Sequence, residues 1–66
     1  MKVEINGAAH DLADGATVAD ALAAIAAPAK GVAVAVDGQV VRRADWPSTR
    51  LAAGAAVEVL TAVQGG

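Results

Sequence analysis

Few side chains in this 66-residue sequence could do chemistry by themselves. His10 is the only histidine and cysteine is absent, which excludes thiolate nucleophiles and disulfides and leaves a metal ion without its usual set of ligands. Ser48 and the threonines supply hydroxyls, but none of them stands in a nucleophile motif. Asp37 and Asp45 could form an acid pair, yet both lie beside turn residues, which favours solvated carboxylates. The sequence therefore predicts a protein that is not an enzyme and binds no metal or cofactor.

The remaining reactive group is the carboxylate at the end of the sequence, which reads Val63, Gln64, Gly65, Gly66. A frayed and inert tail would look the same, so that alternative stays open at this point. Four residues extend over at most about 13–14 Å. Two glycines also have no side chain that would clash inside a narrow tunnel. We expect residues 64–66 to form a flexible tail, mobile in the free protein, that presents Gly66 to a partner.

Composition excludes several classes of partner. The net charge is −2 and the five basic residues are scattered, whereas nucleic-acid binding needs a concentrated basic footprint. The longest uncharged run, at 21–29, is too short to cross a membrane. The first residues contain no apolar stretch typical of a signal peptide. Together with the absence of cysteine, this predicts a cytoplasmic protein without nucleic-acid or membrane partners.

The first half of the sequence predicts a hairpin followed by a helix. Alternating polarity indicates a strand at 2–5, and Asn6-Gly7 is a strong hairpin signal leading to a second strand at 8–12. A two-residue loop would place His10 on the inward face of the first strand, whereas a bulge would turn it outward. Thr17 and Asp20 are suited to cap a helix at 18–27, which Pro28 would end.

The second half predicts three further strands. The run VAVAV at 32–36 is strongly β-prone, and a tight turn leads from it to a short strand at 39–41. Pro47 suggests that 44–49 is irregular, and a last strand is expected at 56–63. One amphipathic helix on one face of a mixed sheet of four to five strands corresponds to an α+β roll of the β-grasp, or ubiquitin-like, kind. We expect residues 1–66 to form one such domain.

The sequence resembles the small sulfur carrier proteins of thiamine biosynthesis over essentially its whole length. The segments that carry the resemblance are MKVEING, DGATVADALA, VAVAVDGQVVRRADW and RLAAGAAVEVLTAVQGG. The resemblance implies that a ubiquitin-activating-like partner enzyme uses ATP and magnesium to adenylate the carboxylate of Gly66. It further implies that persulfide sulfur, from a donor such as a cysteine desulfurase, displaces AMP to leave a thiocarboxylate. Thiazole synthase would take that sulfur for the thiazole ring.

Three other functions are compatible with the same residues. The small sulfur-carrying subunit of molybdopterin synthase shares the terminal Gly-Gly, although such chains tend to be longer and richer in aromatic residues near the tail. A ubiquitin-like modifier would instead form isopeptide bonds with lysines of target proteins. A binding module of another class could carry an inert Gly-Gly.

Outside the tail, we expect partners to dock on an exposed apolar face of the valine-rich sheet, with Arg43 and Arg50 at its rim and Trp46 as a further candidate contact. Trp46 is more often a core or rim residue in a domain of this size, so its contact role is the less favoured interpretation. We expect Arg43→Glu to weaken binding to the adenylating enzyme without unfolding the domain, as titration calorimetry would measure. An unchanged affinity would remove Arg43 from the interface.

Overall fold

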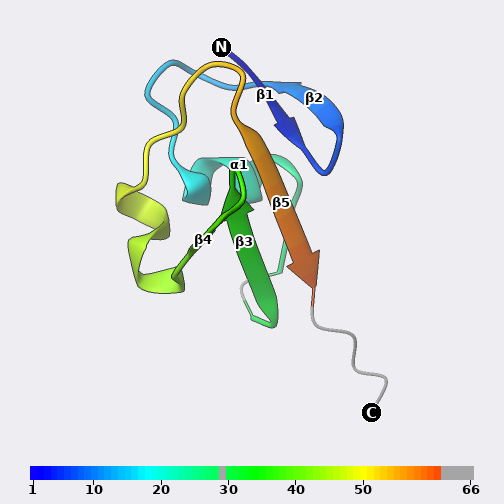
Figure 1. Cartoon of the computed structure of the whole chain (residues 1–66), viewed down its shortest axis with the longest axis vertical. Helices are drawn as coiled ribbons and strands as arrows, with labels where there is room; N and C mark the ends of the chain where they lie inside the picture. The colour runs from blue at the N-terminus through cyan, green and yellow to red at the C-terminus, as the bar shows by residue number, and fades with distance from the viewer. Residues whose placement is uncertain (29, 62–66) are drawn as a thin grey trace.

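The computed structural model describes residues 1–28 and 30–61 (Figure 1). The elements, in chain order, are strand β1 (Lys2–Ile5), strand β2 (Ala8–Asp11), helix α1 (Val18–Ala24), strand β3 (Val32–Val36), strand β4 (Gln39–Val41), the 3₁₀ helix η1 (Arg43–Ser48) and strand β5 (Ala56–Thr61). The strands form one sheet in the order β2-β1-β5-β3-β4, in which only the pairing of β1 with β5 is parallel. This mixed sheet with one α-helix confirms the predicted β-grasp roll.

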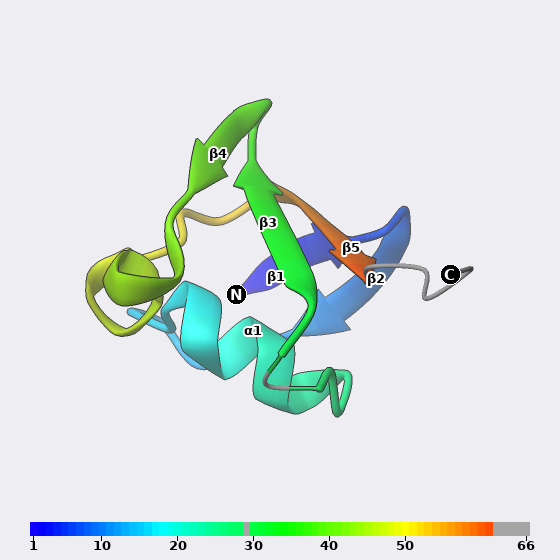
Figure 2. The same ribbon diagram turned by 90° about the horizontal axis from the view of Figure 1, so that it is seen from below.

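The sheet curves over α1, which covers one of its faces (Figure 2). Alternate residues of β1 and β5 point into the space between the helix and the sheet, so that Val3, Ile5, Val57 and Val59 are all buried. The helix contributes Val18, Ala21 and Leu22 to the same core, and Trp46 and Leu51 close its remaining side.

Both hairpins turn on two residues with positive φ, as the tightest hairpin loops require. These residues are Asn6 (φ 52°) and Gly7 (φ 82°) between β1 and β2, and Asp37 (φ 49°) and Gly38 (φ 85°) between β3 and β4. The register of the first hairpin has no bulge and places His10 opposite Val3. His10 therefore lies half-buried on the inward face, as the two-residue loop predicted.

Helix α1 begins as predicted but ends earlier. The hydroxyl of Thr17 accepts a hydrogen bond from the backbone N–H of Asp20, and the Asp20 carboxylate accepts one from the backbone N–H of Thr17. The helix was predicted to reach residue 27, and this was wrong: it ends at Ala24. Pro28 disfavours helical geometry at Ala27, the residue before it. The chain leaves the helix through Ala26, which has a φ of 54°.

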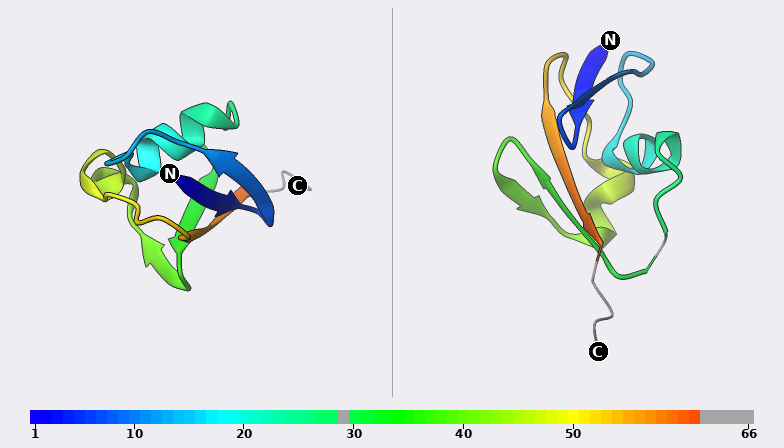
Figure 3. Two further views of the ribbon diagram at one scale, coloured as in Figure 1. Left: turned by 90° about the horizontal axis from the view of Figure 1, so that it is seen from above. Right: turned by 90° about the vertical axis from the view of Figure 1, so that its right-hand side faces the viewer.

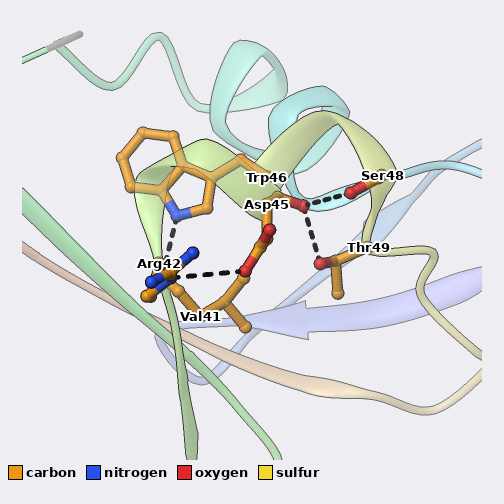
Figure 4. A network of polar contacts seen from close by, with 6 residues as sticks. All are labelled: Val41, Arg42, Asp45, Trp46, Ser48 and Thr49. Atoms are coloured by element: carbon orange, nitrogen blue, oxygen red, sulfur yellow. Dashed lines mark hydrogen bonds and ion pairs between the residues drawn. The ribbon is translucent and has the colours of Figure 1, made fainter.

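Residues 44–49 were predicted to be irregular, and most of them instead belong to η1 (Figure 4). The hydroxyls of Ser48 and Thr49 both donate to the carbonyl of Asp45, at 3.2 and 2.7 Å. The indole Nε1 of Trp46 donates to the carbonyl of Val41 at 3.0 Å and so ties η1 to the end of β4. Side-chain bonds and a buried indole therefore make this proline-containing segment regular.

The end of α1 generates a stability prediction. The N–H groups of Ala26 and Ala27 donate to the carbonyls of Ala23 and Leu22, which is the bonding pattern of a helix end that usually has glycine in the left-handed position. Alanine pays a steric cost there that glycine avoids. We expect Ala26→Gly to raise the free energy of unfolding by about 0.5–1 kcal/mol in urea denaturation.

Ala23→Gly is the matched control, because the same change at an exposed position within the helix should lower the free energy of unfolding by about 1 kcal/mol. Equal destabilisation by both variants would show that the conformation of Ala26 carries no cost.

Candidate functional site

The predicted site residues Val63, Gln64, Gly65 and Gly66 lie outside the described residues, as does the end of the strand predicted at 56–63. The predictions that the last strand reaches residue 63 and that the terminal glycines are mobile lie there too. The described part of this strand is β5, which ends at Thr61 and is where the tail is attached. The site can therefore be built upward from β5 and the groups that hold it.

Strand β5 is the central strand of the sheet, but its two neighbours cover different lengths of it. Strand β1 pairs only with Ala56 and Val57. Strand β3 pairs with β5 from Val57 to Thr61. Figure 1 shows β5 running past the end of β1 toward the C-terminus. The part of β5 nearest the tail is thus paired with a strand on one side only, within the residues that the structure describes.

The two hairpin turns hold β5 through side chains as well as backbone. The carboxamide of Asn6 makes two hydrogen bonds to Val59, donating from Nδ2 to its carbonyl at 3.1 Å and accepting from its N–H at 2.8 Å. At the other end of the strand, Oδ1 of Asp37 accepts from the N–H of Ala56 at 2.9 Å. None of these three side-chain bonds was predicted, because the Asn-Gly and Asp-Gly pairs were interpreted only as turns.

Helix α1 lies on one side of the sheet (Figure 3, right). The opposite face carries an exposed apolar patch. The patch consists of Val40 and Leu60, which are 79% and 68% exposed, with Ala33 and Ala35 between them. We call these four residues the outer patch. Large exposed apolar side chains that are contiguous mark interaction surfaces more often than scattered ones do. Sequence reasoning could have found Leu60, because it alternates with the buried Val57 and Val59 and must point outward.

Acidic side chains border the outer patch on the side of β1. Glu58 lies on the same face, opposite Ala35, and helps to line a hollow of about 70 Å³ between Val40 and Leu60. A second hollow, of about 410 Å³, runs from Leu60 to Glu4 and Asn6 where β1 ends beside β5. The surface next to the tail is therefore apolar with a negatively charged border.

The three predicted contact residues do not lie together. Arg43 and Trp46 both line a groove of about 350 Å³ between α1 and η1. Arg50 is exposed and lies opposite Thr17 at the start of α1. Trp46 is only 8% exposed, consistent with its interpretation as a core residue. Arg43 was predicted to lie at the rim of the exposed apolar sheet face; the structure places it in the groove between α1 and η1 instead, and neither Arg43 nor Arg50 lines the hollow between Val40 and Leu60.

The described residues offer little machinery for chemistry. Among residues 1–28 and 30–61 no three His, Asp or Glu side chains come together in a way that could hold a metal ion. The hydroxyls of Ser48 and Thr49 are used within η1, and Asp45 lies 3.6 Å from the guanidinium of Arg42. None of the helices in these residues is long and apolar enough to span a membrane.

Comparison with known proteins gives the chain its relatives. The family model of the ThiS family matches residues 3–66. A crystal structure of the thiamine biosynthesis protein ThiS from Geobacter metallireducens superposes with a TM-score of 0.83 at 32% identity, and each chain is covered completely. An NMR structure of a thiamine biosynthesis protein from the same organism gives 0.79 at 33% identity, covering 100% of this chain and 88% of that one. No curated protein sequence matches significantly.

The family match runs from the first strand to the last residue of the sequence, and the structural match extends over the whole sheet and helix. The chain therefore shares its fold with the ThiS structure over the full length of both proteins. This chain belongs to the ThiS family.

Proposed function

We propose that this chain, as a sulfur carrier of thiamine biosynthesis, carries its sulfur as a thiocarboxylate on Gly66. The observation that supports the proposal is the ThiS family match, which runs through residue 66 and so includes Gly65 and Gly66. The described residues supply a rigid base for such a tail, because β5 is hydrogen-bonded along its length and ends five residues before Gly66. We also propose that the protein is located in the cytoplasm.

The chemistry starts from a poor electrophile. A carboxylate resists attack by nucleophiles, so the partner enzyme transfers AMP from ATP to an oxygen of the Gly66 carboxylate and releases pyrophosphate. Magnesium would be held by the partner and its nucleotide. The resulting acyl adenylate has AMP as a good leaving group, and Gly65 and Gly66 allow the backbone to enter a narrow active site.

Sulfur then replaces the leaving group in two steps. The terminal sulfur of a persulfide on a donor protein attacks the carbonyl carbon, and AMP departs to leave an acyl disulfide. A second thiol attacks the donor's sulfur of that disulfide, which releases the thiocarboxylate and forms a disulfide between the two thiols. Because this chain contains no cysteine, all of these thiols belong to partners. Thiazole synthase then takes the sulfur.

The outer patch is the surface that we assign to partner docking. It ends at Leu60, immediately before Thr61, so a partner seated on the patch has the tail beside its active site. The carboxylates of Glu58 and Glu4 on the same face favour a partner surface that is apolar in its centre and basic on this side. The alternative function, as the small subunit of molybdopterin synthase, is less favoured because the two similar structures described above are thiamine biosynthesis proteins.

Replacing Leu60 tests the docking surface. Leu60→Gln removes an exposed apolar side chain and should leave the fold unchanged, while weakening binding to the adenylating enzyme by about tenfold. Titration calorimetry gives the affinity and circular dichroism checks the fold. Ala53→Gln, in the exposed turn that precedes β5, is the matched control and should bind like the wild type. Equal affinities for all three proteins would exclude the outer patch.

Deleting Gly66 tests the carrier chemistry. The truncated chain ends on Gly65 and falls short by about 3.5 Å at full extension. Misplacement by about 1 Å already costs around a hundredfold in rate. The variant should therefore fold normally but accept neither AMP nor sulfur.

Intact mass spectrometry with ATP, the adenylating enzyme and a sulfur source provides the measurement. The wild type should gain the mass of one sulfur in place of one oxygen, confined to the C-terminal peptide. Sulfur found elsewhere in the chain, or full transfer by the truncated form, would contradict the proposal.

A further inference from the structure

Strand β5 has an edge that β1 leaves uncovered near the tail. Along this edge the carbonyls of Ala55 and Val57 accept hydrogen bonds from the backbone N–H groups of Glu4 and Asn6, each at 2.9 Å. The strand β1 then ends, and the chain turns back at Asn6-Gly7. Val59 is the next residue of β5 whose backbone groups face this edge. In the described chain, β1 has no residue left to pair with Val59 on this side.

The carboxamide of Asn6 takes the place of the missing strand residue. Its Oδ1 and Nδ2 bind the N–H and the carbonyl of Val59, so one amide supplies the acceptor and the donor that a peptide group would supply. Since these bonds are partly buried, losing them would leave backbone groups unsatisfied away from water. We call this pair of bonds the Asn6 clamp. Within the described residues, these are the last hydrogen bonds that β5 receives from the β1 side before Thr61.

The turn explains why this side chain can reach β5. Asn6 occupies the turn at a φ of 52°, which asparagine tolerates better than most residues, and from there its carboxamide reaches the backbone of Val59. Aspartate would keep the acceptor but lose the donor, and glycine would keep the turn but lose both. Two independent requirements, a left-handed turn and a two-point contact with Val59, are thus met by one residue type.

We propose that Asn6 is a positioning residue for the transfer reactions at Gly66, acting through the backbone of Val59. This inference rests on the proposed function. The clamp fixes the direction in which β5 delivers the chain to its last five residues, which reach at most about 16–18 Å. With these residues extended in a partner's active site, a tilt of about 10° at the end of β5 would displace the terminus by about 3 Å, more than near-attack geometry tolerates.

Asp37 provides a matched control within the same protein. It also occupies the first position of a tight turn, has a φ of 49°, and donates its own N–H to a β5 carbonyl, that of Ala56. Its side chain binds the N–H of Ala56, at the end of β5 remote from the tail. Asn6→Gly removes two side-chain bonds to β5 and Asp37→Gly removes one, at opposite ends of the strand, and neither adds strain because Gly-Gly also suits these turns.

The experiment measures kcat and KM of each carrier variant in adenylation by the adenylating enzyme, followed as ATP–pyrophosphate exchange. Asn6→Gly should lower kcat by about tenfold and leave KM within about twofold, because the outer patch is unchanged. Asn6→Asp, which keeps one of the two bonds, should lie between Asn6→Gly and the wild type. Asp37→Gly should leave kcat within about twofold of the wild type. A purely structural role for Asn6 would lower the folded fraction of the carrier, which raises the apparent KM and leaves kcat unchanged.

Amide hydrogen exchange shows whether the clamp itself is lost. The Val59 N–H should exchange at least about tenfold faster in Asn6→Gly than in the wild type, whereas Val34 in the neighbouring strand should not change. Wild-type kcat in Asn6→Gly, or an equal loss of kcat in Asp37→Gly, would overturn the positioning role while the carrier function stands. A wild-type protein that accepts no AMP would instead overturn the proposed function, and the positioning role with it.

Discussion

The fold depends on the placement of its last strand in the middle of the sheet. Strand β5 joins the hairpin of β1 and β2 to the hairpin of β3 and β4, and neither hairpin pairs directly with the other. Its inward side chains, Val57 and Val59, are buried against the core that α1 completes. Isolated two-stranded hairpins are marginally stable in water, so the sheet exists as a unit only when β5 is in place.

This arrangement divides the work of a carrier between two parts of one strand. The inward side chains of β5 stabilise the domain, while its outward side chain Leu60 is exposed on the opposite face. The same strand leads directly into the tail. Under the proposed function, docking, stability and presentation of Gly66 would all depend on one strand, although the residues responsible are different. That separation allows the surface to vary without disturbing the core.

Local chemistry explains which parts of the fold could be predicted from the sequence. The hairpin at Asn6-Gly7 and the cap formed by Thr17 and Asp20 depend on residues a few positions apart, and both were confirmed. The end of α1 and the helix η1 depend on more than local preference. An alanine adopts the left-handed conformation at the helix end, and the indole of Trp46 finds its partner only once β4 is formed.

The candidate site follows the same division. The Gly-Gly terminus and the family are visible in the sequence, because they reside in residue types and their order. The Asn6 clamp joins residues 53 positions apart, so no local pattern could indicate it. The outer patch was visible only in part. The alternation in β5 determines that Leu60 points outward, but its proximity to Val40 requires the strand order.

The central position of β5 also bears on protein synthesis. A chain interrupted before residue 56 lacks both ladders that join the two halves of the sheet and the valines that fill its core. Such a fragment cannot bury enough apolar surface to fold, and unfolded chains are removed by cellular proteases. Completion of the domain therefore shows that translation has passed β5, so few folded chains end before this strand.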